Sequence, residues 1–179
     1  CLHLLSDPRT YEELTEEPTP ELRVAISSMT EHSLANGWIS RKEADFLVCW
    51  DSIIPYFYIL PKVHKNSEKS PGRPIVAGIN SILEPLSKFA DAFLRPLDQS
   101  TNTYLQDTKD VLRLLKTIDF DSSTDLLMSF DVESLYTSLP QGETLEIKEQ
   151  ILFESTWPYN TARAFVLECI EVALTQNFF

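Results

Sequence analysis

The sequence is poor in several residue types, and each shortage excludes a class of protein. Its 179 residues include three cysteines, an odd number spread widely, which argues against a disulfide framework or a zinc site. The three histidines likewise show no metal-ligand spacing. No run approaches the ~20 apolar residues of a membrane-spanning helix, and no charged-then-apolar signal pattern opens the chain. We therefore expect a soluble, intracellular protein that has no membrane partner.

Glycine is also scarce, with four residues, whereas hydrophobic residues make up 43% of the chain. This composition is sufficient for one domain with a substantial buried core. The chain starts at Cys1 rather than at a methionine, and it stops at Phe179 inside an apolar pattern. Both ends therefore predict a fragment of a longer protein.

Basic residues are outnumbered, with 15 Lys and Arg against 27 Asp and Glu and a net charge of -12, which is unusual for a nucleic-acid enzyme. The imbalance is not uniform along the chain. Residues 1–55 carry 4 basic and 10 acidic side chains, a net of -6, whereas residues 56–75 carry 4 basic and 1 acidic, a net of +3. Positive charge is therefore concentrated in a single window.

This positive window has the pattern of a β-hairpin. Residues 56–65 begin as an aromatic-rich strand and end in positive charge, and a second strand starts after a polar loop. Arginine makes planar bidentate contacts to phosphate oxygens and lysine supplies a compact charge, so the hairpin suits a triphosphate. A basic surface hairpin without a ligand is the alternative interpretation. The four basic side chains of the window are Lys62, Lys65, Lys69 and Arg73.

A carboxylate ends the apolar run at residues 126–128, which is too short for a helix and suited to a buried strand. Burying a lone carboxylate costs several kcal/mol unless a cation or hydrogen-bond donors meet it. We therefore expect Asp131 to face a cleft or a metal, the alternative being that it caps the turn that follows. Tyr136 lies five residues further on.

Three stretches in this order resemble motifs of the reverse transcriptases: Leu-Pro-Lys at residues 60–62, Gly-Arg-Pro-Ile-Val at 72–76, and the Asp-x4-Tyr spacing at 131–136. Together with Tyr-Phe at 56–57 and Lys-Val-His-Lys at 62–65, they look most like the Penelope-like retroelement (retrotransposon) branch. The resemblance covers roughly residues 50–179.

The resemblance implies an α+β fold that forms part of a right-hand polymerase. Residues 1–55 would be a helical lead-in, residues 56–125 the fingers with their β-hairpin, and residues 126–179 a partial palm with its first strand. The chain would stop before the second catalytic strand. The activity implied is RNA-directed DNA polymerase, a nucleotidyltransferase that adds a dNTP to a DNA primer 3'-hydroxyl on an RNA template. A nuclear location follows from that activity.

The resemblance also implies roles for individual residues. Asp131 would be catalytic and would bind Mg2+ together with the backbone carbonyl of Val132. Tyr136 would lie beneath the sugar of the incoming nucleotide and exclude a 2'-hydroxyl. Arg73 and Lys62 would hold the phosphates, and Lys65 is a further candidate for nucleotide binding.

The sequence also departs from the reverse-transcriptase pattern. No Asp-Asp dipeptide occurs in it, and the remainder of the palm and the thumb are missing. Two magnesium ions about 4 Å apart need shared carboxylates, so we expect this chain alone to be inactive. One alternative is a non-catalytic, nucleic-acid-binding relic of a retroelement. Another is a nucleotide-sugar transferase built on Asp119 and Asp121, although their surroundings are typical of a solvated loop.

Apolar stripes at helical spacing predict the helices. Ser40 and Glu43 have the spacing of a capping box at the start of one of them, and Pro96 marks the end of another. Helices are expected at residues 19–36, 40–50, 81–96, 109–118, 142–154 and after 161.

Overall fold

The computed structural model describes residues 5–8, 10–63, 72–132, 135–154 and 162–179. It combines helices with one two-stranded antiparallel sheet, so the α+β class predicted from the sequence is confirmed. The elements are α2 (Thr19–Ala35), α3 (Arg41–Leu47), β1 (Tyr56–Pro61), β2 (Gly72–Ala77), α4 (Glu84–Gln99), α5 (Thr108–Thr117), α6 (Leu135–Ser138), α7 (Gln141–Glu154) and α8 (Arg163–Thr175). None of the helices in these ranges is long and apolar enough to cross a membrane.

The termini of several helices follow local sequence rules. The predicted capping box opens α3, since the Ser40 hydroxyl accepts the Glu43 N–H at 3.3 Å and the Glu43 carboxylate accepts the Ser40 N–H at 2.7 Å. Gly37, with φ of 70°, follows the end of α2 in a conformation that favours glycine. The predicted stop at Pro96 is wrong, because α4 continues to Gln99. A proline in the last turn removes few hydrogen bonds, so the helix tolerates it there.

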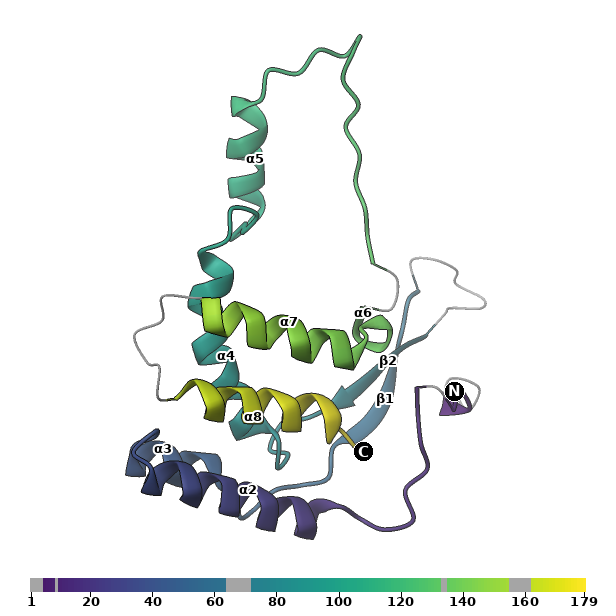
Figure 1. Cartoon of the computed structure of the whole chain (residues 1–179). Helices are drawn as coiled ribbons and strands as arrows, with labels where there is room; N and C mark the ends of the chain where they lie inside the picture. The colour runs from purple at the N-terminus through teal and green to yellow at the C-terminus, as the bar shows by residue number, and fades with distance from the viewer. Residues whose placement is uncertain (1–4, 9, 64–71, 133–134, 155–161) are drawn as a thin grey trace.

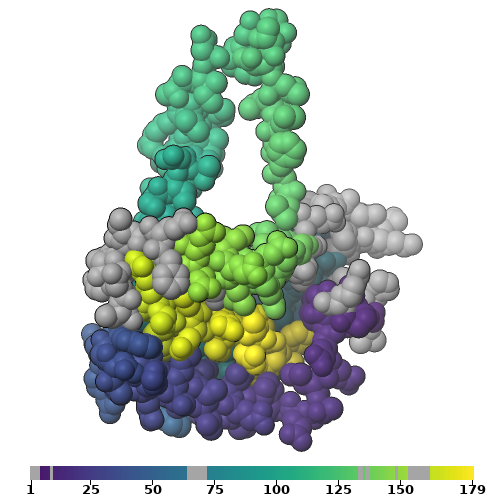
Figure 2. Space-filling model, in the orientation of Figure 1, coloured from purple at the N-terminus to yellow at the C-terminus, as the bar shows by residue number. Residues whose placement is uncertain are grey.

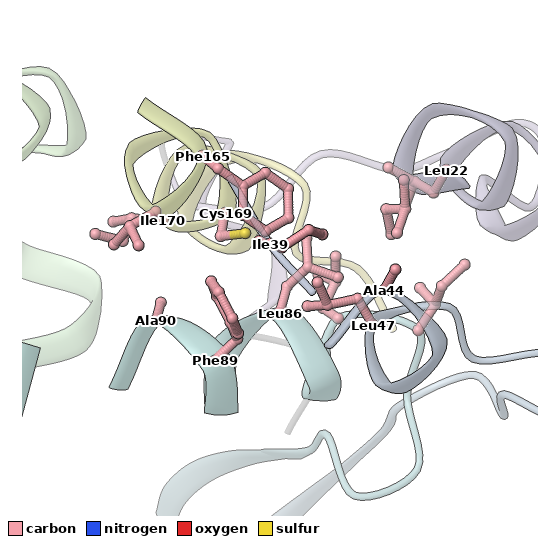
Figure 3. Close-up of a cluster of buried hydrophobic side chains, with 14 of the residues drawn as sticks. Leu22, Ile39, Ala44, Leu47, Leu86, Phe89, Ala90, Phe165, Cys169 and Ile170 are labelled. Carbon is pink, nitrogen blue, oxygen red and sulfur yellow. The ribbon is translucent and has the colours of Figure 1, made fainter. Parts of the chain in front are cut away.

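The hydrophobic core lies where α4 packs against α8, with α2 and α3 on its border (Figure 3). Phe89 of α4 and Phe165 of α8 meet edge to face, with ring centroids 5.4 Å apart. Burial of each large apolar side chain stabilises the fold by roughly 1.5–3 kcal/mol, so this cluster is the main source of stability. The cluster also includes Leu22, Ile26, Ile39, Ala44, Leu47, Ile82, Leu86, Ala90, Cys169 and Ile170.

The predicted hairpin is present. Strands β1 and β2 pair in antiparallel register, with Tyr56 opposite Ala77 and Pro61 opposite Gly72. Phe57 of β1 stacks on Phe179 with ring centroids 5.3 Å apart. The C-terminal residue therefore joins the hairpin to the helical body, next to the end of α8.

A long arm projects from this body (Figures 1 and 2). It consists of α5, a turn at residues 121–125 and an extended segment, residues 126–132, that returns to α6. No side chain of α5 is buried, and all side chains of the extended segment are exposed.

The arm overturns one expectation, because residues 126–132 form no strand and are not buried. Leu126 is 78% exposed and Phe130 is 87% exposed. A strand needs a neighbour to accept and donate its backbone hydrogen bonds, and no described segment pairs with this one. The prediction of a first palm strand at these residues is therefore wrong. The apolar composition at residues 126–128 that suggested a strand does not produce one here.

Candidate functional site

The β1–β2 hairpin brings two of the three reverse-transcriptase-like stretches together. In its register Leu60 lies opposite Arg73 and Pro61 lies opposite Gly72. The Leu-Pro-Lys stretch at 60–62 and the Gly-Arg-Pro stretch at 72–74 therefore become neighbours, although a loop separates them in the sequence. Lys62 comes directly after the end of β1, next to this pair.

Local sequence explains why the strands meet in this way. Pro74 has no N–H to donate, and a two-stranded sheet has only edge strands, so proline is tolerated in β2. Gly72 is required for a steric reason, because a Cβ added there would collide with Cγ2 of Ile59 on the facing strand. The Ile59 side chain packs over position 72 only because this position has no side chain.

One face of the hairpin is open and carries aromatic rings beside a cation. Side chains alternate along a strand, so Tyr56, Tyr58 and Leu60 share a face and all three are exposed. The two tyrosine rings have centroids 5.9 Å apart. Since directly paired residues point to the same side, exposed Arg73 belongs to this face as the partner of Leu60. Stacking surface and positive charge are therefore combined on one surface.

The other face holds the hairpin in place. Phe57 and Ile59 are half-buried there, and Phe57 makes the stacked contact with Phe179 described above. Lys62, the residue that follows the end of β1, is half-buried. The predicted cations Lys65 and Lys69 lie outside the described residues, so their expected contribution stays a prediction.

Asp131 lies on the extended part of the arm. It is exposed, and it makes no hydrogen bond or ion pair with any described residue, Arg73 and Lys62 included. Val132 beside it is 60% exposed. Tyr136 lies in the short helix α6, and its side chain is outside the described part of the structure. The roles expected for these three residues stay predictions.

Magnesium was expected at Asp131 and at the Val132 carbonyl. Across the described ranges, no three His, Cys, Asp or Glu side chains come close enough to hold a metal ion. A two-metal site needs shared carboxylates, and Asp131 belongs to no cluster of three such side chains among these residues. The described residues alone therefore do not fit a pair of magnesium ions.

Of the rival acidic pair, Asp121 begins the turn at the tip of the arm and Asp119 lies just before that turn. The Asp121 carboxylate accepts hydrogen bonds from Ser123, at 2.8 Å from its N–H and 2.7 Å from its hydroxyl. These bonds lower the pKa of Asp121. The Asp121 N–H in turn donates to the Asp125 carboxylate at 2.9 Å. Asp121 therefore closes a turn, which agrees with the solvated-loop interpretation of this pair.

The sequence interpretation did not single out Tyr56 and Tyr58 as a joint surface. A signal was available, because residues two apart in a strand share a face. Both are aromatic, and in the antiparallel register of the hairpin they lie on the same face as Arg73.

No family model matches the chain, and no curated protein or solved structure matches it. Functional inference therefore depends on the residues and geometry of the hairpin and the arm.

Proposed function

We propose that this chain is part of an RNA-directed DNA polymerase, and that its β1–β2 hairpin binds the triphosphate of the incoming dNTP. One observation supports this most, namely the register that sets Leu60 opposite Arg73. It makes neighbours of the two stretches that resemble fingers motifs and puts an exposed guanidinium on the open face. In this proposal residues 56–125 belong to the fingers, residues 126–179 to a partial palm, and residues 1–55 to a helical lead-in.

The chemistry of phosphate recognition agrees with this arrangement. The guanidinium of Arg73 presents a planar fork of donors that matches phosphate oxygens, and Lys62 adds a point charge nearby. Both groups are reachable by solvent, so the contact is strongly screened by salt. The tyrosine rings on the same face offer a surface for a base or sugar.

The proposal also assigns roles in metal and sugar binding to three residues outside the hairpin, Asp131, Val132 and Tyr136. We assign Asp131 and the Val132 carbonyl to magnesium, and Tyr136 to the sugar of the nucleotide, in a polymerase that supplies a second acidic strand. The RNA template and DNA primer are its other partners. Because the sequence contains no Asp-Asp dipeptide to supply that strand, we expect no primer extension by this chain alone with magnesium and a primed RNA template.

Binding of a labelled dNTP by the full chain tests the triphosphate site. Hydrogen bonds to charged groups are worth about 1.5–3 kcal/mol, and exposure favours the lower end, so Arg73→Ala should raise the dissociation constant about tenfold. Lys62→Ala should raise it by less, since a single point charge is lost. Arg41→Ala is the matched control, because Arg41 is an exposed arginine on α3 that forms only a surface ion pair with Asp45. If Arg73→Ala and Arg41→Ala bind the dNTP equally well, the triphosphate site is wrong.

A second candidate function is a nucleic-acid-binding relic without catalysis. The exposed pair Tyr56 and Tyr58 beside Arg73 favours it, because stacked rings with a nearby cation suit unpaired bases. In this case Tyr58→Leu should weaken binding of primed RNA while dNTP binding stays absent or unchanged. Arg73→Ala should also flatten the slope of log affinity against log salt by about one unit.

The transferase alternative makes the opposite prediction. It requires that Asp119→Ala abolish binding of a nucleotide sugar while Asp131→Ala has no effect. The hydrogen bonds from Ser123 to the Asp121 carboxylate argue against it, because both end on Oδ1, one of the two oxygens that a metal could use.

A further inference from the structure

An open groove runs between α2 and α8, which lie side by side on the body (Figure 1). Its volume is about 560 Å³. The floor is apolar and the rim is acidic, and the described residues that line the groove include no lysine or arginine. The apolar residues that matter here are Leu22, Met29 and Val172, and the acidic ones are Glu21, Glu168 and Glu171.

Helix α5 has the complementary character. Its apolar residues cover a broad stripe on one side, and Leu112 is 54% exposed and Leu115 is 42% exposed. Lys109 and Lys116, two helical turns apart, lie along one border of this stripe. Arg113 faces away from the stripe and pairs with Asp110 at 2.5 Å. An apolar stripe bordered by two lysines thus remains in water along the helix.

We propose that α5 of one copy of the chain docks in the α2–α8 groove of a second copy, and that the contact is reciprocal. The leucines of α5 would cover the apolar floor, and Lys109 and Lys116 would meet the glutamates of the rim. Charge complementarity specifies the occupant, since the groove carries three acids and the border of the stripe carries two bases.

The occupant is a second copy rather than the chain's own α5 because of the geometry of the arm. Figure 1 shows α5 projecting from the end of the body opposite to α2, with α4, α7 and α8 between them. A reciprocal exchange gives two equivalent contacts related by a twofold axis, which is the commonest closed arrangement of identical chains.

The test uses sedimentation of the full chain over a range of concentrations, without nucleic acid. We expect a monomer–dimer equilibrium. The pair of changes Lys109→Glu and Lys116→Glu should raise the dimer dissociation constant at least about tenfold, and so should the pair Glu168→Lys and Glu171→Lys. The pair Glu143→Lys and Glu146→Lys, two exposed residues of α7, is the matched control for the glutamate pair, with the same spacing and charge change, and should leave the equilibrium unchanged.

Mixing the two double variants gives the sharpest result. A heterodimer between the lysine-to-glutamate chain and the glutamate-to-lysine chain has one wild-type contact and one contact with both charges reversed. We therefore expect the mixture to dimerise although neither variant does so alone, which also shows that both variants are folded. A monomeric wild type at the highest concentration reached, open-ended growth of oligomers, or a mixture that stays monomeric would each overturn the proposal.

Discussion

Replacing Gly72 by alanine should destabilise the candidate site directly. The new Cβ would collide with Cγ2 of Ile59. Isoleucine is stiff at χ1, so this methyl group cannot rotate away without leaving its preferred rotamer. Overpacking of this kind costs about 1–3 kcal/mol. Because the hairpin has only two strands, we expect the cost to appear as local opening of β1 from β2 rather than as global unfolding.

Hydrogen exchange of the β1 amides measures this opening. A cost of 1–3 kcal/mol corresponds to a loss of protection of roughly fivefold to 150-fold. Gly78→Ala is the matched control, since a Cβ there would meet only the Ser81 hydroxyl at an ordinary 3.7 Å. Adding Ile59→Ala to Gly72→Ala removes the colliding methyl group, so the double variant should be less destabilised than the sum of the single changes. Equal protection in Gly72→Ala and Gly78→Ala, or strict additivity in the double variant, would refute the reasoning.

Two further predictions concern the helices. Burial, with the Glu168 charge as the smaller cause, raises the pKa of Cys169 from 9.0 to about 12, so the proton is held more tightly in the folded chain. The stability that the protonated Cys169 thiol contributes is complete below pH 9 and is lost between pH 9 and about 12. Urea titrations across this window should therefore show the unfolding free energy of the wild type falling relative to that of Cys169→Ala by up to ~4 kcal/mol. A difference between the two proteins that stays constant with pH would contradict the raised pKa. Ser40→Ala should lower the unfolding free energy by about 1 kcal/mol through loss of the cap on α3, whereas Ser28→Ala, exposed on α2, should change it by less than about 0.5 kcal/mol, and equal effects would argue against the cap.

The hairpin could be predicted from the sequence because everything that determines it is local. Its two strands fall within residues 56–77, and Pro74 and Gly72 mark positions with special backbone requirements. Arg73 is exposed because side chains alternate between the two faces along β2. The capping box at Ser40 was predictable for the same reason, since the four residues 40–43 contain the whole signal.

The surroundings of Asp131 could not be predicted in the same way. Residues 126–128 have the composition of a buried strand, but composition alone does not supply the neighbouring strand or the covering layer. Pairing depends on segments distant in the sequence, and none of the described segments pairs with residues 126–132. The same limit applies to α5, whose amphipathic pattern predicts a buried face although no side chain of the helix is buried.

The exposed arm has a part in both proposals, the polymerase site at Asp131 and the docking of α5 on a second copy. Phe130 and Leu127 are exposed in an extended segment that pairs with no strand in the described part of the chain. Covering such side chains is worth roughly 1.5–3 kcal/mol each, but only a neighbouring strand covers them and satisfies the backbone at once. In the polymerase proposal, the second acidic strand would be that neighbour and would set the position of the Asp131 carboxylate. Docking of α5 on a second copy would fix one end of the arm without pairing residues 126–132, so dimer formation and assembly of an acidic site are separate events that separate substitutions can abolish.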